Sequence, residues 1–193
     1  MILAMINQIA AGGETPDRAE LEGLLLDLAA GDREALAQVY RRTRAAVYAV
    51  ALSFLKDAHE AQDVTQDVFV RIWESAPAYR PQGSPMAWIM TIARNLSLMK
   101  LREKRKLVEL DQEEWNAIPA EAPSVTTEDR ALLQEALTIL TDEERQILLL
   151  HAVSDLKHRE IAQVLELPLS TVLSKYHRSL KKLRNHMKGE MTL

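Results

Sequence analysis

The stretch from Leu156 to Leu180 reads LKHREIAQVLELPLSTVLSKYHRSL and predicts a helix-turn-helix. Ile161, Ala162 and Leu165 recur at the spacing of one helical face and form the buried stripe of the first helix. Ala162 is small, so a second helix can cross closely over it. The turn falls at residues 166–168 and ends with Pro168, which cannot continue the first helix.

The second helix of this motif presents a basic outer face. We predict an N-cap at Ser170 and a helix from Thr171 to about Met187. Its outer face carries Ser174, Lys175, His177, Arg178, Lys181 and Lys182. A helix fits the major groove, where such side chains reach base edges and phosphates. An ordinary helical hairpin with a basic face is the alternative, but the matched small residue, turn and cap favour DNA binding.

Composition limits the class of protein. The 193 residues are 47% hydrophobic and 27% charged, which is typical of a soluble globular protein with one or two small domains. The absence of cysteine excludes disulfide scaffolds, thiolate zinc sites and cysteine nucleophiles, and it fits a reducing cytoplasm. No apolar run reaches the roughly 18 residues that span a bilayer, and the apolar start, residues 1–11, lacks the basic flank of a signal peptide.

The net charge of −4 is distributed unevenly along the chain. Residues 80–106 carry +6, residues 107–129 carry −7 and residues 155–193 carry +4. Basic clusters attract phosphates whatever the average charge is, so two separate segments are candidates for nucleic-acid contact. For the run from Lys100 to Lys106, a solvated helix end is the alternative, because cations also favour a helix C-terminus.

Helical periodicity dominates the chain, and no alternating strand pattern occurs. The predicted fold is all-α, with two small helical bundles joined by a flexible acidic linker. We expect helices over residues 18–30, 32–54, 57–75, 85–106, 141–153, 157–165 and 171–187, with a further helical segment resuming near 127. Asp57, Ser84 and Thr141 are the predicted N-caps of three of them, and Tyr40 is predicted to face inward.

A second motif lies in the N-terminal half. The segment from Asp63 to Trp73 reads DVTQDVFVRIW and places Asp63, Gln66 and Asp67 on one helix face. After a proline-rich loop, residues 88–95 read WIMTIARN and lead into the basic run. Together with the helix-turn-helix, this ordered set closely resembles the extracytoplasmic-function (group IV) sigma factors of bacterial RNA polymerase. The resemblance covers residues 24–187.

The resemblance implies a role for each matched position. Asp63, Gln66, Asp67, Phe69 and Trp73 match the surface that binds core polymerase. The set that matches the minus-ten DNA contacts is Tyr79, Arg80, Ser84, Trp88, Arg94, Asn95, Arg102, Arg105 and Lys106, with core packing the alternative for Trp88. In this set the loop and Asn95 match a pocket that captures a flipped base, which must leave the stack before it can be recognised. On the last helix, Thr171, Ser174, Lys175, His177 and Arg178 match the minus-thirty-five contacts, which Lys181 and Lys182 extend.

Three positions depart from the family pattern and leave the promoter sequence open. Ser170 stands where a glycine is common, and Met99 where an acid is common. Leu173 stands where a basic residue is frequent, so a DNA contact is either lost there or replaced by an apolar contact with a thymine methyl group.

The resemblance divides the chain into an N-terminal extension (1–20), a sigma region 2 domain (21–107), an acidic linker (108–127) and a sigma region 4 domain (128–193). It implies an alternative sigma factor that binds core RNA polymerase, directs it to promoters and helps melt the minus-ten region. The implied partners are the β′ clamp helices and β flap of the polymerase, promoter DNA and an anti-sigma factor. The acidic linker either threads the polymerase cleft as a nucleic-acid mimic or is a solvated tether.

The sequence does not favour an enzyme, and it leaves two other classes of function as alternatives. An enzyme is not expected, because the chain has no phosphate-binding glycine loop, no recognisable serine–histidine–acid set and therefore no catalytic residues. Its five histidines are scattered over helices, so we expect no metal, no cofactor and no small-molecule substrate, and also no membrane insertion. The principal alternative is an autonomous helix-turn-helix regulator with a helical sensory domain, and a sigma antagonist or mimic is a third class. We expect a cytoplasmic protein.

Overall fold

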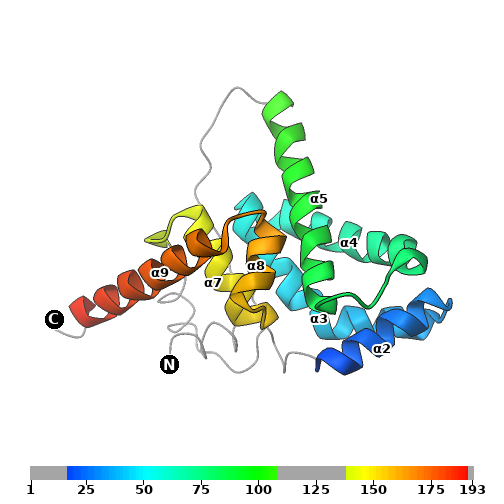
Figure 1. Ribbon diagram of the computed structural model, residues 1–193. Helices are drawn as coiled ribbons and strands as arrows, with labels where there is room; N and C mark the ends of the chain where they lie inside the picture. Colours follow the sequence, from blue (N-terminus) through cyan, green and yellow to red (C-terminus); the bar gives the residue numbers. More distant parts are fainter. Residues whose placement is uncertain (1–16, 108–137, 191–193) are drawn as a thin grey trace.

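Helices make up the regular structure of the protein. The computed structural model describes residues 17–107 and 138–190, so the predicted linker and most of the predicted N-terminal extension lie outside the described residues. In chain order the elements are α2 (Arg18–Ala29), α3 (Arg33–Leu55), α4 (Ala58–Ser75), a 3-10 turn η1 (Ala76–Ala78), α5 (Pro85–Leu107), α7 (Asp142–Ser154), α8 (His158–Leu165) and α9 (Leu169–Glu190) (Figure 1). The two described ranges contain no strand, which confirms the all-α prediction.

Helix α3 lies at the centre of the N-terminal bundle and packs against α2, α4 and α5. Val39, Val47 and Val50 on its inner face are fully buried, and burying such a side chain stabilises a fold by about 1.5–3 kcal/mol. The inward orientation predicted for Tyr40 is wrong. Its ring is exposed and lies edge-on against Phe69 of α4, with the centroids 4.7 Å apart, because Tyr40 sits at the margin of the buried stripe.

Three of the predicted N-caps, at Asp57, Ser84 and Thr141, form and fix where their helices begin. Asp57 accepts a hydrogen bond from the first turn of α4, and the Ser84 hydroxyl does the same for α5. At α7 the Thr141 side chain accepts from the Glu144 N–H at 3.4 Å, and the Glu144 carboxylate accepts from the Thr141 N–H at 3.0 Å. This reciprocal capping box satisfies backbone donors that the first turn of a helix otherwise leaves unpaired.

Helices α7, α8 and α9 pack together as the C-terminal bundle and contain the predicted helix-turn-helix. The turn between α8 and α9 begins at Glu166, whose backbone is left-handed with φ of 56°. The predicted N-cap at Ser170 is wrong, because α9 begins at Leu169. The carbonyl of Pro168 accepts from the N–H groups of Thr171 and Val172, which places Ser170 inside the first turn.

The two bundles contact each other. Helix α7 packs against α3, and α8 packs against α5 (Figure 1). The C-terminal half of α5 projects away from both bundles, as Figure 1 shows. The contact between bundles therefore leaves the basic end of α5 on the outside of the molecule.

Candidate nucleic-acid interface

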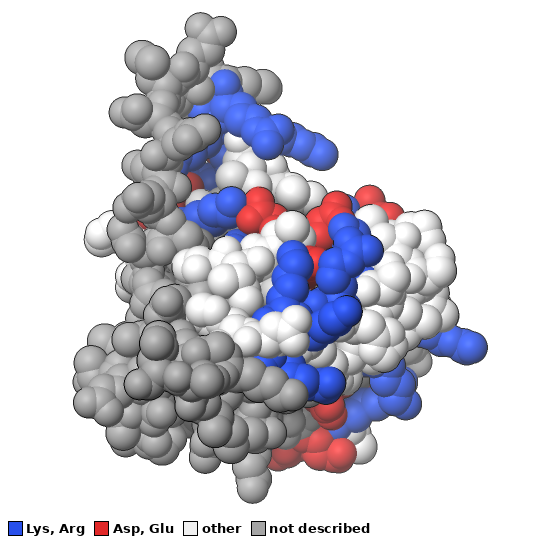
Figure 2. All heavy atoms as spheres, turned by 90° about the vertical axis from the view of Figure 1, so that its left-hand side faces the viewer, with Lys and Arg blue, Asp and Glu red and all other residues white. Residues whose placement is uncertain are grey.

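The outer face of α9 carries the predicted minus-thirty-five set. Ser174, His177, Arg178 and Lys181 are exposed there, and Thr171 is half-buried. Figure 2 shows Lys and Arg atoms gathered across the middle of the side of the molecule where α9 ends, with a second basic group at the top, where α5 projects. Both basic segments of the sequence are therefore open to solvent and available to phosphates.

Two lysines of this set are already paired within the domain. The Lys175 ammonium lies 2.7 Å from the carboxylate of Glu143, and that of Lys182 lies 2.6 Å from Glu144. Glu144 is only 1% exposed. Burial raises the pKa of its carboxyl, but the hydrogen bonds from Lys182 and Thr141 outweigh burial and hold the pKa below its ordinary value. Lys182 therefore neutralises a buried acid at the start of α7.

The predicted minus-ten pocket begins at the loop before α5. Tyr79 is 5% exposed and packs edge-on against Trp88 of α5, with the ring centroids 5.0 Å apart. Arg80 is exposed and donates to the carbonyls of Pro77 and Tyr79 at 3.2 and 2.8 Å. Ser84 is engaged in capping α5. The Tyr79–Trp88 pair thus packs beneath this loop, and Arg80 stabilises the loop through hydrogen bonds to its backbone.

The remaining members of the minus-ten set follow α5 outward. Asn95, Arg102 and Arg105 are exposed, and neither arginine forms an ion pair with any residue that the structure describes. The side chain of Lys106 lies outside the described part of the chain. Asn95 and Arg102 are seven residues apart, which places them on one face of the helix.

Arg94 lies at the contact between the two bundles. Its guanidinium donates to both carboxylate oxygens of Glu166, at 2.9 and 3.1 Å, and also to the Asn95 side-chain oxygen at 3.3 Å. The side chain of Arg94 is only 13% exposed. The hydrogen bond from Arg94 and its positive charge lower the pKa of Glu166. A predicted DNA-contacting arginine is therefore occupied by an acid from the turn of the helix-turn-helix.

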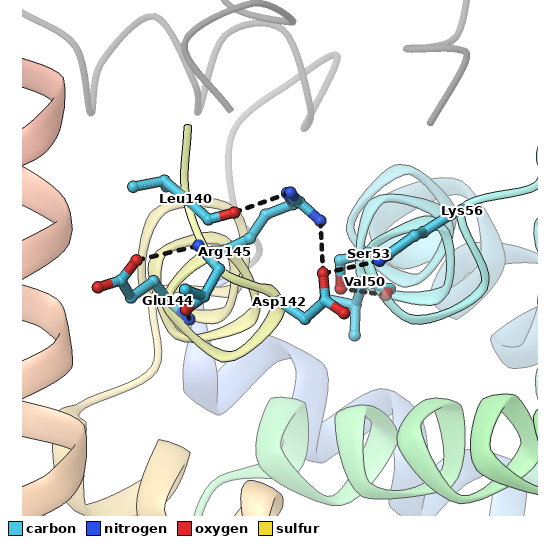
Figure 3. Close-up of polar contacts among 8 residues, drawn as sticks. Val50, Ser53, Lys56, Leu140, Asp142, Glu144 and Arg145 are labelled. Carbon is cyan, nitrogen blue, oxygen red and sulfur yellow. Dashed lines mark hydrogen bonds and ion pairs between the residues drawn. The ribbon is translucent and has the colours of Figure 1, made fainter. Parts of the chain in front are cut away.

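A second ion pair joins the bundles at the end of α3 (Figure 3). Lys56, in the left-handed conformation that ends α3, places its ammonium 2.9 Å from the Asp142 carboxylate at the start of α7. Arg145 contacts the same carboxylate at 3.2 Å and donates to the carbonyl of Leu140 at 3.0 Å. Between the Arg94 and Lys56 contacts lies a cavity of about 240 Å³, which Phe54 helps to line. The contact between bundles is polar at these points and incompletely packed.

The predicted polymerase-binding set lies on α4. Asp63, Gln66, Asp67 and Trp73 are exposed, whereas Phe69 is 6% exposed and lies beneath the ring of Tyr40. Among the described side chains, the most exposed large hydrophobic one is that of Val70, which is on the same outer face three residues after Asp67. Val70 is not among the residues predicted from the sequence, although its position outside the buried stripe of Val64, Val68 and Ile72 is a signal that it faces outward.

Aromatic rings join the three helices of the C-terminal bundle. His151 of α7 stacks on His158 of α8, with centroids 4.9 Å apart, and both rings lie edge-on to Tyr176 of α9 at 5.0 and 4.6 Å. His151 Nδ1 is 2.9 Å from the carbonyl of Leu156, so this nitrogen carries the proton. Burial, followed by the nearby His151 and His177, lowers the pKa of His158. Burial therefore favours the neutral form of His158, whose ring packs between α7 and α9.

Comparison with known proteins identifies the family. Residues 39–107 match the family Sigma-70 region 2, and residues 130–183 match the family Sigma-70, region 4. The ECF RNA polymerase sigma factor SigK of Mycolicibacterium vanbaalenii is 30% identical over 86% of this chain and 88% of its own length. SigK of Mycobacterium ulcerans is also 30% identical, over 88% of this chain and 95% of its own. The chain belongs to the extracytoplasmic-function (ECF) sigma factors.

The fold of this sigma factor is shared with solved structures. CnrH, in complex with the cytosolic domain of CnrY, is similar with a TM-score of 0.61 and 24% identity, over 86% of this chain and 96% of that one. The sigma factor RpoE of Bartonella quintana, in complex with the anti-sigma factor NepR, is similar with a TM-score of 0.65 and 22% identity, over 79% and 96%. At these identities the likeness establishes the architecture of helices.

Membership of the family decides between the classes of function left open by the sequence. The protein is an alternative sigma factor, which directs RNA polymerase to promoters, and not an autonomous regulator with a sensory domain. The α4 motif and the helix-turn-helix fall in the matched region 2 and region 4, respectively. Among the described helices of this sigma factor, none has the length and hydropathy needed to cross a membrane.

Proposed function

We propose that this sigma factor divides its work between two domains, over residues 21–107 and 128–193. The N-terminal domain binds core polymerase through the exposed face of α4. Asp63 and Asp67 supply charge on that face, and Val70 and Trp73 supply apolar surface. A centre of exposed apolar side chains with charged neighbours is the usual composition of a protein interface. The coiled-coil clamp helices of the β′ subunit are the partner, and Phe69 supports this face from beneath.

The same domain opens the minus-ten region. Asn95 lies on the exposed side of α5, next to the loop that Tyr79 and Trp88 support. A rigid pocket offsets the cost of unstacking a base, so a flipped base is held between this loop and Asn95. Arg102 and Arg105, which are exposed further along α5, neutralise the phosphates of the separated strand.

The C-terminal domain places α9 in the major groove of the minus-thirty-five element. Ser174, His177 and Arg178 face solvent on the outer side of this helix and contact bases and phosphates. The β flap of the polymerase binds this domain and sets its distance from α4. Two separate contacts on one DNA molecule raise the overall affinity, because the second contact forms within a complex that already exists.

The free protein is held closed, and the ion pair of Arg94 with Glu166 is the observation that carries this part of the proposal. This ion pair connects the proposed minus-ten face of one domain with the turn of the helix-turn-helix in the other. While this contact holds, Arg94 of the proposed minus-ten set is paired with Glu166 and is not available to DNA. Binding to core polymerase therefore separates the domains, and the free protein binds promoter DNA weakly.

The protein works in the cytoplasm and performs no covalent chemistry itself. The solved structures of CnrH and RpoE contain a bound protein, which for RpoE is named as an anti-sigma factor. We expect an anti-sigma factor to hold this protein inactive as well, by covering the surfaces described above until a signal arrives. The acidic linker at 108–127 connects the two domains during this change.

Transcription in vitro tests the proposal. Purified core polymerase is given a library of random promoters, with and without the protein, and the start sites are sequenced. We expect a set of start sites that depends on the protein and shares one element near −35 and another near −10. An Asp63→Lys, Asp67→Lys variant serves as a folded control that fails to bind core. Identical start sites with and without the wild-type protein would overturn the assignment.

A further inference from the structure

We propose that Leu173 contacts the methyl group of a thymine in the minus-thirty-five element and sets the base preference at that position. The inference rests on the proposed placement of α9 in the major groove. It names a residue for specificity that the predicted set of polar and basic contacts does not include.

The exposure of Leu173 is unusual for its helix. The large apolar side chains of Val172, Tyr176 and Leu183 are buried against α7 and α8. Leu173 is 37% exposed, and no other large hydrophobic side chain is exposed among those described on α9. A single exposed leucine needs no explanation on an ordinary surface, but this one stands on the face that is proposed to meet DNA.

The position of Leu173 favours contact with bases over contact with phosphates. Leu173, His177 and Lys181 are spaced by four residues and follow one another along the outer face of α9. Leu173 is the member of this line closest to the helix N-terminus. Recognition helices contact base edges with their N-terminal residues, whereas the later lysine is placed to reach the backbone.

The polar neighbours of Leu173 are engaged within the protein. The Ser174 hydroxyl donates to the carbonyl of Thr171 at 3.0 Å, and Lys175 pairs with Glu143 at 2.7 Å. The Lys175 ammonium is thus directed toward α7, and the Ser174 hydroxyl proton is used within its own helix although Ser174 remains exposed. Leu173 is therefore the side chain that offers an apolar surface on this part of α9, between the exposed Ser170 and His177.

Thymine is the base that presents a methyl group in the major groove. Burial of one methyl group against an apolar side chain is worth about a fourfold change in affinity. We therefore expect thymine to be preferred by about that factor at one position of the element. Uracil pairs as thymine does but lacks the methyl group, so replacing thymine by uracil isolates this contact.

The experiment uses holoenzyme assembled from core polymerase and the full chain, on promoters that the wild-type protein selects from a random library. Each thymine of the minus-thirty-five element is replaced in turn by deoxyuridine, and promoter affinity is measured. The wild-type protein is expected to lose about fourfold at one thymine. Leu173→Ala is expected to bind the thymine and uracil templates equally, and Leu173→Met, which keeps an apolar side chain, to retain the difference.

Leu26→Ala is the matched control, because Leu26 is an exposed leucine on α2 in the other domain. It is expected to keep the full response to uracil, and thermal unfolding confirms that both alanine variants are folded. If promoter complexes form but Leu173→Ala responds to every uracil as the wild type does, the inference is overturned while the proposed function stands. If no complex depends on the minus-thirty-five element, the proposed placement of α9 fails and the inference fails with it.

Discussion

Arg94 and Glu166 are 72 residues apart in the chain, yet the guanidinium of one donates to both oxygens of the other at 2.9 and 3.1 Å. Arg94 adjoins Asn95 in the predicted minus-ten set, and Glu166 begins the turn of the helix-turn-helix. The Glu166 carboxylate is thus paired with the Arg94 guanidinium, a positive charge that DNA would otherwise attract. This contact therefore joins the predicted minus-ten set in one bundle to the helix-turn-helix in the other.

Breaking the contact between the domains should increase DNA binding by the free protein. We expect Glu166→Gln to raise its affinity for promoter duplex about twofold to fivefold, because an ion pair in which one partner, Glu166, is exposed to solvent is worth little individually. Loss of an acid near DNA would also raise affinity directly. Lys56→Gln separates opening of the domains from this direct effect of charge. It breaks the ion pair with Asp142, which should open the contact between the domains, but it removes a cation, which by itself would weaken DNA binding.

An increase for both variants in an electrophoretic assay without core polymerase would therefore report opening. Glu74→Gln is the control, because Glu74 pairs with Arg71 inside a single helix. Tight, sequence-specific binding of duplex by the wild-type protein alone would contradict the closed state.

Charge reversal on α4 should weaken binding to core polymerase and leave the fold intact. Asp63 and Asp67 are exposed and form no ion pair with any described residue, so Asp63→Lys with Asp67→Lys breaks no internal contact. We expect at least a tenfold loss in affinity for β′ and an unchanged melting temperature. Asp27→Lys, a reversal at an exposed position of α2, is the control. An unchanged pull-down of β′ would exclude this face.

Two adjacent lysines of α9 should respond differently to substitution. Lys182→Ala leaves the buried Glu144 without its cationic partner and is expected to cost about 1–3 kcal/mol of unfolding free energy. Lys181→Ala removes an exposed cation and should lower promoter affinity with little change in stability. Denaturant unfolding and a salt titration of binding measure the two effects. Equal stability of both variants would show that the pair with Glu144 is unimportant.

The C-terminal domain should lose stability in mild acid. The pKa of His158 is lowered in the folded protein from an ordinary value of 6.5. Above pH 6.5 the group is neutral in both states, so it contributes no pH dependence. Below that pH the unfolded chain takes up the proton more readily, and the free energy of unfolding falls. His158→Gln should flatten this fall between pH 7 and 5. A wild-type profile that is flat over this range would contradict the expectation.

Asn95→Ala should impair strand opening more than assembly with polymerase. Asn95 is exposed and receives one long hydrogen bond from Arg94, so its loss leaves the packing of α5 intact. We expect a tenfold or greater loss of promoter opening by permanganate footprinting, with core binding within twofold of wild type. Thr91→Ala, which removes a hydroxyl bonded to its own helix, is the control. Equal losses of opening and assembly would show that Asn95 is structural.

Most of the local structure follows from sequence patterns. The caps at Asp57, Ser84 and Thr141 form, because a side-chain acceptor at the start of a helix acts only on the next few residues. Where local signals compete, the prediction fails. Helix α9 begins before Ser170, the predicted N-cap, because the carbonyl of Pro168 accepts the first hydrogen bonds of the helix. Tyr40 is exposed, although helical periodicity predicts that it faces inward, because it lies at the edge of the buried stripe.

The candidate sites are predicted less completely than the helices. Periodicity identifies which positions of α9 face outward, but it does not show that Lys182 reaches back to a buried acid on α7. It also does not show that Phe69 and Tyr79, matched to binding surfaces, are buried beneath them. Exposure depends on neighbours from other helices, and those neighbours are distant in the chain.

The amino-acid sequence by itself determined the helices, most of their starts and the order of the two motifs, because capping and helical periodicity are short-range properties of the chain. The contacts of Arg94 with Glu166 and of Lys56 with Asp142 were decided only by the tertiary structure. Each joins charged side chains on different bundles, and no pattern in the sequence marks one acid rather than another as the partner. Packing of the bundles brings these side chains together, and that packing is a property of the whole molecule.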